Sequence, residues 1–221
     1  KNWPLVDLFV APPSTMTALI ARPRVQVPRP ACTIGGSLAD RQAGLTTHTS
    51  LWPASPLFCD WLLDSKPLLQ TPGTRVVELG SGTGHMAATL ARNCEATVVA
   101  TEIPRALEGL RAGVERMAPG AAVEVVDCDW AELTGVGTGD AVAERLGAWD
   151  LVVGADLVWT YEGAVLVPAA YAALLGRNPG AEAYLALWNR GMAGVMRAFY
   201  AACGEVGVEL ELVNKQVPKE R

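Results

Sequence analysis

The chain has 221 residues, half of them hydrophobic, and a formal net charge of −5 at pH 7. This length suits one full-sized domain with a buried core, and charges interrupt every long apolar run, which excludes a membrane span. An acidic chain without a lysine or arginine cluster lacks the basic footprint of a nucleic-acid binder, so a protein or peptide partner is favoured.

The first segment, residues 1–36, contains six prolines and has Asp7 as its only acid. It shows no amphipathic pattern, so we expect a proline-rich N-terminal arm, with import into an organelle as the minority alternative. The chain's five cysteines are odd in number and have no C-x-x-C spacing, which favours reduced thiols in a cytoplasmic or nuclear setting. The acids and histidines show no metal-ligand spacing, so no metal is predicted.

Residues 37–221 are expected to form the main domain, with residues 37–72 as its N-terminal cap. Within the cap, Leu51-Trp52-Pro53 precedes an apolar stretch in which Leu57, Trp61 and Leu62 have helical spacing. The cap is therefore predicted to be part of the same domain and not a separate one.

From residue 75 onward, short apolar runs alternate with helical patterns, which is typical of β-α-β units and a parallel sheet. Five runs are nearly continuous in apolar residues, as in strands covered on both faces: 75–79, 97–101, 123–126, 151–153 and 184–187. A last run, 208–212, alternates with glutamates and should lie near the sheet edge. The segment 135–139 is predicted to be a surface loop. These features indicate an α/β, Rossmann-like, doubly wound sheet.

A glycine-rich loop, from Glu78 to Gly84, follows the first apolar run. Glycines at alternating positions let the backbone turn sharply and pass close to a bulky ligand, because no Cβ intrudes. The dinucleotide pattern G-x-G-x-x-G fails, since its third glycine would fall on His85. The acidic-x-G-x-G-x-G order instead resembles motif I of S-adenosylmethionine-dependent methyltransferases; a tight turn without a ligand is the alternative.

Acidic and aromatic residues close the next three strands, at the edge where doubly wound sheets bind ligands. Glu102 occupies the position of an acid that accepts hydrogen bonds from ribose hydroxyls, or it favours a helix N-terminus. Asp129 and Trp130 offer a carboxylate and an indole to adenine, with Trp130 as a core residue the alternative. Asp156 follows the small residue Ala155 and either faces the transferable methyl group or caps the next helix.

Four segments in this order carry a family resemblance: 51–55, 77–84, 129–130 and 150–156. Together they resemble the seven-strand protein-lysine methyltransferases of the methyltransferase-16 family, over about residues 34–215. The resemblance implies a mostly parallel seven-strand sheet, although the family's last strand has no counterpart after Lys215. It also implies S-adenosylmethionine as cofactor, contacted by Trp52, Gly80, Ser81, Gly82, Glu102, Trp130 and Ala155. Glu78, Gly84 and Asp129 complete the candidate cofactor-binding set.

Asp156 heads the acidic-x-x-aromatic motif of the family, whose fourth residue, usually Tyr or Phe, is Trp159 here. The resemblance implies SN2 transfer of a methyl group to a lysine amine of a protein substrate. We predict that Asp156 orients the amine and that Trp159 or Tyr161 walls an apolar channel. A non-catalytic partner-binding subunit and a small-molecule methyltransferase remain as alternatives.

Overall fold

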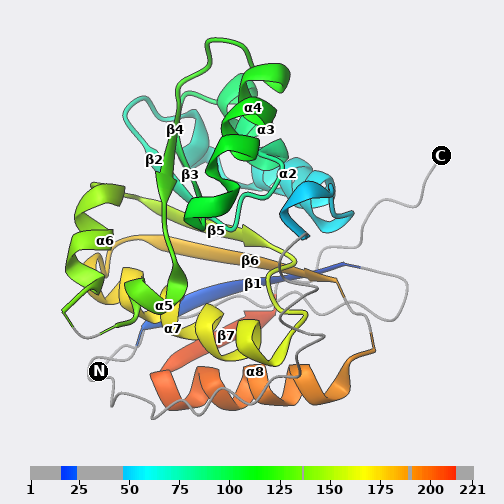
Figure 1. Cartoon of the computed structure of the whole chain (residues 1–221), viewed down its shortest axis with the longest axis vertical. Coiled ribbons are helices and arrows are strands. Elements are labelled where there is room, and N and C mark those ends of the chain that lie inside the picture. The colour runs from blue at the N-terminus through cyan, green and yellow to red at the C-terminus, as the bar shows by residue number, and fades with distance from the viewer. Residues whose placement is uncertain (1–15, 24–46, 136, 189–190, 213–221) are drawn as a thin grey trace.

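The computed structural model describes residues 16–23, 47–135, 137–188 and 191–212, and the structural statements below concern these residues. They form an α/β fold around a seven-strand sheet with the order β4-β3-β2-β5-β6-β1-β7 (Figure 1). Most of the predicted N-terminal arm and the beginning of the predicted cap lie outside the described residues. No described helix combines the length and the apolar character that crossing a membrane requires.

Five strands run parallel to one another and form one side of the sheet: β2 (Arg75–Leu79), β3 (Thr97–Glu102), β4 (Val123–Asp127), β5 (Leu151–Ala155) and β6 (Glu182–Trp188). In the register, Val77 lies opposite Val99 of β3 and Val152 of β5, and all three side chains are fully buried. This burial on both faces explains why the strands have continuous apolar sequences. The predicted doubly wound sheet is confirmed, with strand boundaries shifted by one or two residues.

The remaining two strands, β1 (Met16–Pro23) and β7 (Val208–Leu212), join the sheet through antiparallel pairs. β1 lies between β6 and β7, and its Leu19 is opposite Leu185 on one side and Leu212 on the other. β7 is at the edge, as its alternating sequence predicts. β1 was not predicted, because it belongs to the proline-rich segment. The N-terminal segment thus supplies the seventh strand of the sheet.

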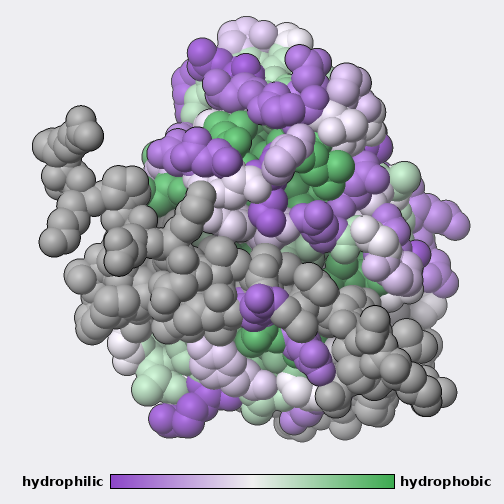
Figure 2. All heavy atoms as spheres, turned by 180° about the vertical axis from the view of Figure 1, so that it is seen from behind, coloured by the Kyte–Doolittle hydropathy of each residue, from purple (hydrophilic) through white to green (hydrophobic). Residues whose placement is uncertain are grey.

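Helices cover both faces of the sheet (Figure 1). On one face lie α2 (Ala54–Ser65), α3 (His85–Asn93) and α4 (Leu107–Met117). The short turn η1 (Thr47–Thr49) precedes α2, η2 (Pro67–Gln70) follows it, and η3 (Pro104–Ala106) precedes α4. On the other face lie α5 (Trp130–Leu133), α6 (Gly139–Leu146), α7 (Tyr161–Arg177) and α8 (Ala193–Val206). Figure 2 shows hydrophilic side chains mixed with small hydrophobic patches on the described surface of the rear face.

The predicted surface loop at 135–139 is wrong at its end. Gly139 is buried and begins α6. A Cβ there would collide with the carbonyl oxygen of Leu133, at the end of α5. This glycine therefore permits close packing of two short helices and does not mark an open loop.

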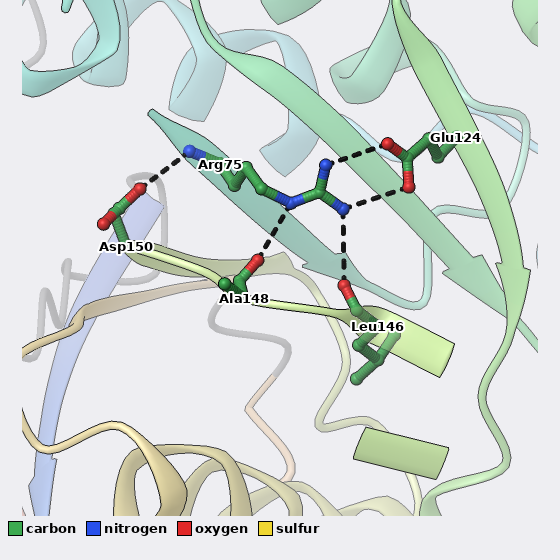
Figure 3. A network of polar contacts seen from close by, with 5 residues as sticks. All are labelled: Arg75, Glu124, Leu146, Ala148 and Asp150. Carbon is green, nitrogen blue, oxygen red and sulfur yellow. Dashed lines mark hydrogen bonds and ion pairs between the residues drawn. The ribbon is translucent and has the colours of Figure 1, made fainter. Parts of the chain in front are cut away.

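A polar network ties the amino-terminal end of β2 to its surroundings (Figure 3). The guanidinium of Arg75 donates two hydrogen bonds to Glu124 of β4, at 2.8 and 3.0 Å, and one to the carbonyl of Ala148, at 2.9 Å. The backbone N–H of Arg75 donates to the carboxylate of Asp150 at 2.9 Å. Arg75 thus links β2 across β3 to β4, and also to the segment that enters β5.

Candidate functional site

A pocket of about 600 Å³ opens at the carboxyl ends of the parallel strands. Its walls come from the ends of β2, β3, β4 and β5, from the segment around η1 and from the start of α7. Most of the residues singled out from the sequence line it: Trp52, Gly80, Gly82, Glu102, Asp129, Trp130, Ala155, Asp156 and Trp159. The structure therefore brings together side chains that are more than a hundred residues apart in the sequence.

Three residues of the predicted cofactor-binding set do not line this pocket: Glu78, Ser81 and Gly84. The hydroxyl oxygen of Ser81 accepts a hydrogen bond from the N–H of Thr101 at 3.0 Å, and the N–H of Ser81 donates to the carbonyl of Thr101 at 2.8 Å. Ser81 thus fastens the glycine loop to β3. Gly84 faces α4, where a Cβ would lie 2.6 Å from Val114.

Glu78 lies beneath the loop and is only 3% exposed. Burial raises the pKa of its carboxyl group to about 8, and hydrogen bonds from Ser81 and from the backbone of Ala87 offset part of this increase. One carboxyl oxygen, Oε2, is buried without a hydrogen-bond partner among the described residues. An uncharged carboxyl group fits this environment better than a carboxylate.

The glycine loop leaves β2 with a left-handed backbone conformation at Gly80, where φ is 63°. A Cβ at Gly80 would lie 2.8 Å from Leu157 and 3.1 Å from Trp130. Any larger residue would therefore strain the backbone and push against two side chains that also line the pocket. The absence of a side chain at Gly80 is therefore required by the neighbouring pocket residues, in addition to the left-handed backbone of the turn.

Glu102 ends β3 beside this loop. Its Oε1 accepts a hydrogen bond from the N–H of Gly82 at 3.1 Å, and its Oε2 accepts one from the N–H of Ile103 at 3.0 Å. Burial raises the pKa of Glu102 above its ordinary value, and these two hydrogen bonds and the nearby His48 and Arg105 offset only part of this increase. The carboxyl group is thereby held in one orientation at the pocket wall.

The end of β4 contributes Asp129 and Trp130. The Oδ1 of Asp129 accepts a hydrogen bond from the N–H of Ala131 at 2.8 Å, so Asp129 is the N-cap of α5. Trp130 is partly buried against the core and also faces the pocket beside Gly80. Its two readings from the sequence, core residue and pocket residue, are both compatible with this position.

Asp156 follows β5 and is 5% exposed. Its φ of 59° makes it the one non-glycine residue with a left-handed backbone in the described part of the chain. Its N–H donates to the carbonyl of Ala186 at 2.7 Å. The alternative that Asp156 caps the next helix is wrong, because the N-cap of α7 is Thr160, whose hydroxyl accepts from the N–H of Gly163 at 2.9 Å. The backbone of β6 thus fixes Asp156 at the pocket.

The two aromatic candidates at the start of α7 separate in the structure. Trp159 lines the pocket, whereas Tyr161 does not and is 47% exposed. The hydroxyl of Tyr161 occupies the space that a Cβ on Gly194 would fill, so the ring points toward α8. Only Trp159 can wall the predicted channel in this conformation.

Sequence reasoning missed His48, which lies in η1 and lines the pocket. Its backbone is 3.7 to 3.8 Å from the position of a Cβ on Gly82, and its ring Nδ1 is buried without a partner among the described residues. The indole N–H of Trp52 donates to the carbonyl of Thr47 at 3.0 Å and closes the turn that contains His48. The upstream Trp-Pro pair was the one sequence signal that pointed to this segment.

The parallel sheet, the glycine loop and the pocket at the strand ends define a Rossmann-like methyltransferase fold. Residues 39–191 match the family Methyltransf_16, described as lysine methyltransferase, and this match spans more than half of the chain. The chain belongs to this family. The resemblance to this family that was predicted from the sequence is confirmed, and the cofactor of the family is S-adenosylmethionine.

Several solved structures are similar to this chain. They include a methyltransferase from Geobacter sulfurreducens in complex with S-adenosyl-L-homocysteine (20% identity, TM-score 0.43, 65% of this chain and 54% of that chain). A second is a methyltransferase from Methanococcus maripaludis (15%, 0.42, 66% and 59%). A third is magnesium protoporphyrin IX methyltransferase from Synechocystis (19%, 0.38, 60% and 52%). The chain spans little more than half the length of these proteins. The search of curated proteins found no match.

The residues present fit S-adenosylmethionine. The pocket volume of about 600 Å³ is in the range of small-molecule sites. Glu102 presents a fixed carboxyl group for hydroxyl donors, Trp130 presents an indole, and Gly80 keeps the wall free of a side chain that would strike its neighbours. These are the chemical features that a nucleoside joined to an amino acid requires.

Proposed function

We propose that the protein transfers a methyl group from S-adenosylmethionine to the side-chain amine of a lysine in a protein substrate. The family match supports the reaction class. The observation that carries the proposal is the buried carboxyl group of Asp156, fixed at the end of β5 in a pocket that also contains Trp159. An acid and an aromatic ring together suit a cationic amine.

The cofactor would occupy the part of the pocket formed by β2, β3 and β4. Glu102 would accept hydrogen bonds from its ribose, Asp129 and Trp130 would contact its adenine, and the backbone at Gly80 and Gly82 would border its amino-acid end. Trp52 and Ala155 would complete this part of the wall. When bound, the cofactor supplies a methyl group on a positively charged sulfur.

For methyl transfer, the residues of the pocket must hold the lysine amine of the substrate in its neutral form and in the correct orientation. A lysine amine has a free pKa near 10.4, so neutralising it at pH 7 costs on the order of 4 to 5 kcal/mol unless its surroundings lower that pKa. Contact with Trp159 and Leu157 would lower the pKa by removing water. Asp156 would orient the amine through a hydrogen bond, and the proton would leave to water, because an ordinary carboxylate is too weak a base. Positioning then provides most of the catalysis.

The test combines labelled S-adenosylmethionine, a cell extract and the Asp156→Asn variant. Asparagine tolerates the left-handed backbone and keeps the size of the side chain, so it removes the charge without adding strain. We expect the wild type to label lysines of one or a few proteins, and the variant to lose this activity while retaining its affinity for S-adenosylhomocysteine. Label in the low-mass fraction would identify a small-molecule methyltransferase. Absence of S-adenosylhomocysteine binding to the wild type would identify a non-catalytic subunit.

A further inference from the structure

The pocket continues beyond the part assigned to the cofactor. β5 is the neighbour of β2 in the sheet, so the end of β5 lies next to the glycine loop that leaves β2. The segment after β5 leads into α7. This segment contributes Asp156, Trp159, Thr160, Glu162, Gly163 and Leu166 to the pocket wall. An acceptor bound at Asp156 would therefore lie beside the first turns of α7.

Glu162 is the charged residue of this segment that no other described residue neutralises. Glu162 is among the residues that line the pocket, it is exposed, and it makes no hydrogen bond or ion pair with any described residue. The other acids of the wall differ. Glu102 accepts hydrogen bonds from two backbone N–H groups, Asp129 caps α5, and Asp156 is 5% exposed. Glu162 thus offers a solvent-facing negative charge at the pocket mouth.

Asp156 is buried and Glu162 is exposed, so the two acids would face different parts of a substrate. A lysine that reaches the buried Asp156 extends its whole side chain into the pocket, so its backbone and neighbouring residues stay near the mouth. The exposed Glu162 would then face a residue beside the target lysine and not the reacting amine. A negative charge at that place favours a positively charged neighbour.

We propose that Glu162 is a specificity-determining residue that favours acceptor lysines with a second basic residue nearby in the substrate. The inference rests on the proposed lysine methylation. An exposed ion pair of this kind contributes a modest free energy, so the preference for a basic over a neutral neighbour should be about two- to fivefold. The acidic net charge of the chain supports the same class of partner.

The test is to map the methylated lysines in a cell extract treated with labelled S-adenosylmethionine and the wild type, Glu162→Gln or Glu162→Lys. The matched control is Glu108→Gln, because Glu108 also lies exposed in the first turn of a helix, α4, but does not line the pocket. Thermal unfolding of each variant checks that all are folded.

We expect Lys and Arg to be enriched about twofold or more around the lysines that the wild type and Glu108→Gln methylate. Glu162→Gln should abolish this enrichment, and Glu162→Lys should shift methylation toward lysines with acidic neighbours. Methylated lysines with the same neighbours in all four proteins would overturn the role of Glu162 and leave the proposed function intact. Absence of any methylated lysine with the folded wild type would overturn both.

Discussion

The carboxylate of Glu102 accepts a hydrogen bond from the backbone N–H of Gly82 at 3.1 Å. This bond joins the end of β3 to the glycine loop that follows β2, and it fixes the carboxyl group before any ligand binds. The second carboxyl oxygen of Glu102 accepts a hydrogen bond from the N–H of Ile103 at 3.0 Å. A carboxylate held in this way loses little freedom on binding a hydroxyl donor, so it should contribute strongly to cofactor affinity.

The first prediction is that Glu102→Gln weakens the binding of S-adenosylhomocysteine. Hydrogen bonds to a charged group contribute about 1.5 to 3 kcal/mol, so the dissociation constant should rise roughly 10- to 100-fold. Isothermal titration calorimetry measures this change. Glu115→Gln, on the exposed surface of α4, is the control and should bind like the wild type. Unchanged affinity in Glu102→Gln would show that this carboxylate does not contact the cofactor.

The second prediction concerns two glycines of α4. A Cβ on Gly113 would collide with the carbonyl oxygen of Thr83 in the glycine loop, whereas a Cβ on Gly109 meets nothing within 4 Å. Gly113→Ala should therefore destabilise the protein by about 1 to 3 kcal/mol and weaken cofactor binding, because α4 must move away from the loop. Gly109→Ala should stabilise it by about 0.5 to 1 kcal/mol through helix propensity. Urea denaturation of both variants measures the difference, and equal effects would contradict it.

The third prediction follows from the buried carboxyl group of Glu78. Its folded-state pKa of about 8 lies above the ordinary value of 4.5, so the folded state favours the protonated form. Glu78 therefore gives its full contribution to stability below pH 4.5, and that contribution falls as the pH rises toward 8. The loss is on the order of 4 to 5 kcal/mol over this range.

Glu78→Gln removes this ionisation while keeping a side chain of the same size. We expect the variant to gain stability relative to the wild type as the pH rises from 5 to 8, measured by chemical denaturation at several pH values. A constant difference between the two proteins across this range would show that Glu78 titrates normally in the folded state.

The sequence predicted the fold where local pattern and burial agree. The runs that become β2, β3 and β5 are apolar throughout because both faces of these strands are covered, and the three glycines mark the loop after β2. The sequence did not predict β1, since this strand is defined by pairing with β6 and β7 and lies among prolines and arginines. Such pairing depends on residues far away in the chain, which local propensity cannot report.

Some residues of the candidate site could be predicted from the sequence and others could not. Residues at strand ends could be placed at one edge of the sheet from topology alone, and most of them line the pocket. His48 and Glu162 could not, because each follows or lies in a turn outside the strands, and the direction of such a turn is set by its own hydrogen bonds and not by the strand pattern. For His48 the contact is the hydrogen bond between Trp52 and Thr47, and for Glu162 it is the cap that Thr160 makes at the start of α7.

The last prediction concerns the pair formed by Arg75 and Glu124, shown in Figure 3. The hydrogen bond from Arg75 lowers the pKa of Glu124 below its ordinary value. The stabilising effect of the pair is therefore present above the unfolded-state pKa near 4.5 and is lost as the pH falls through the lower folded-state value. Both side chains are partly exposed, so the charge interaction should contribute only about 0.2 to 1 kcal/mol.

Arg75→Met should cost more than this, about 1 to 3 kcal/mol, because it also leaves the carbonyl of Ala148 without its donor. Arg177→Met is a suitable comparison: Arg177 pairs with Asp140, whose side chain is 87% exposed, so this variant should lose less than Arg75→Met. Urea denaturation at pH 7 and below pH 4 would test both statements. The stability difference between the wild type and Glu124→Gln should shrink at the lower pH; a difference that grows instead would mean that Arg75 and Glu124 do not form this pair in solution.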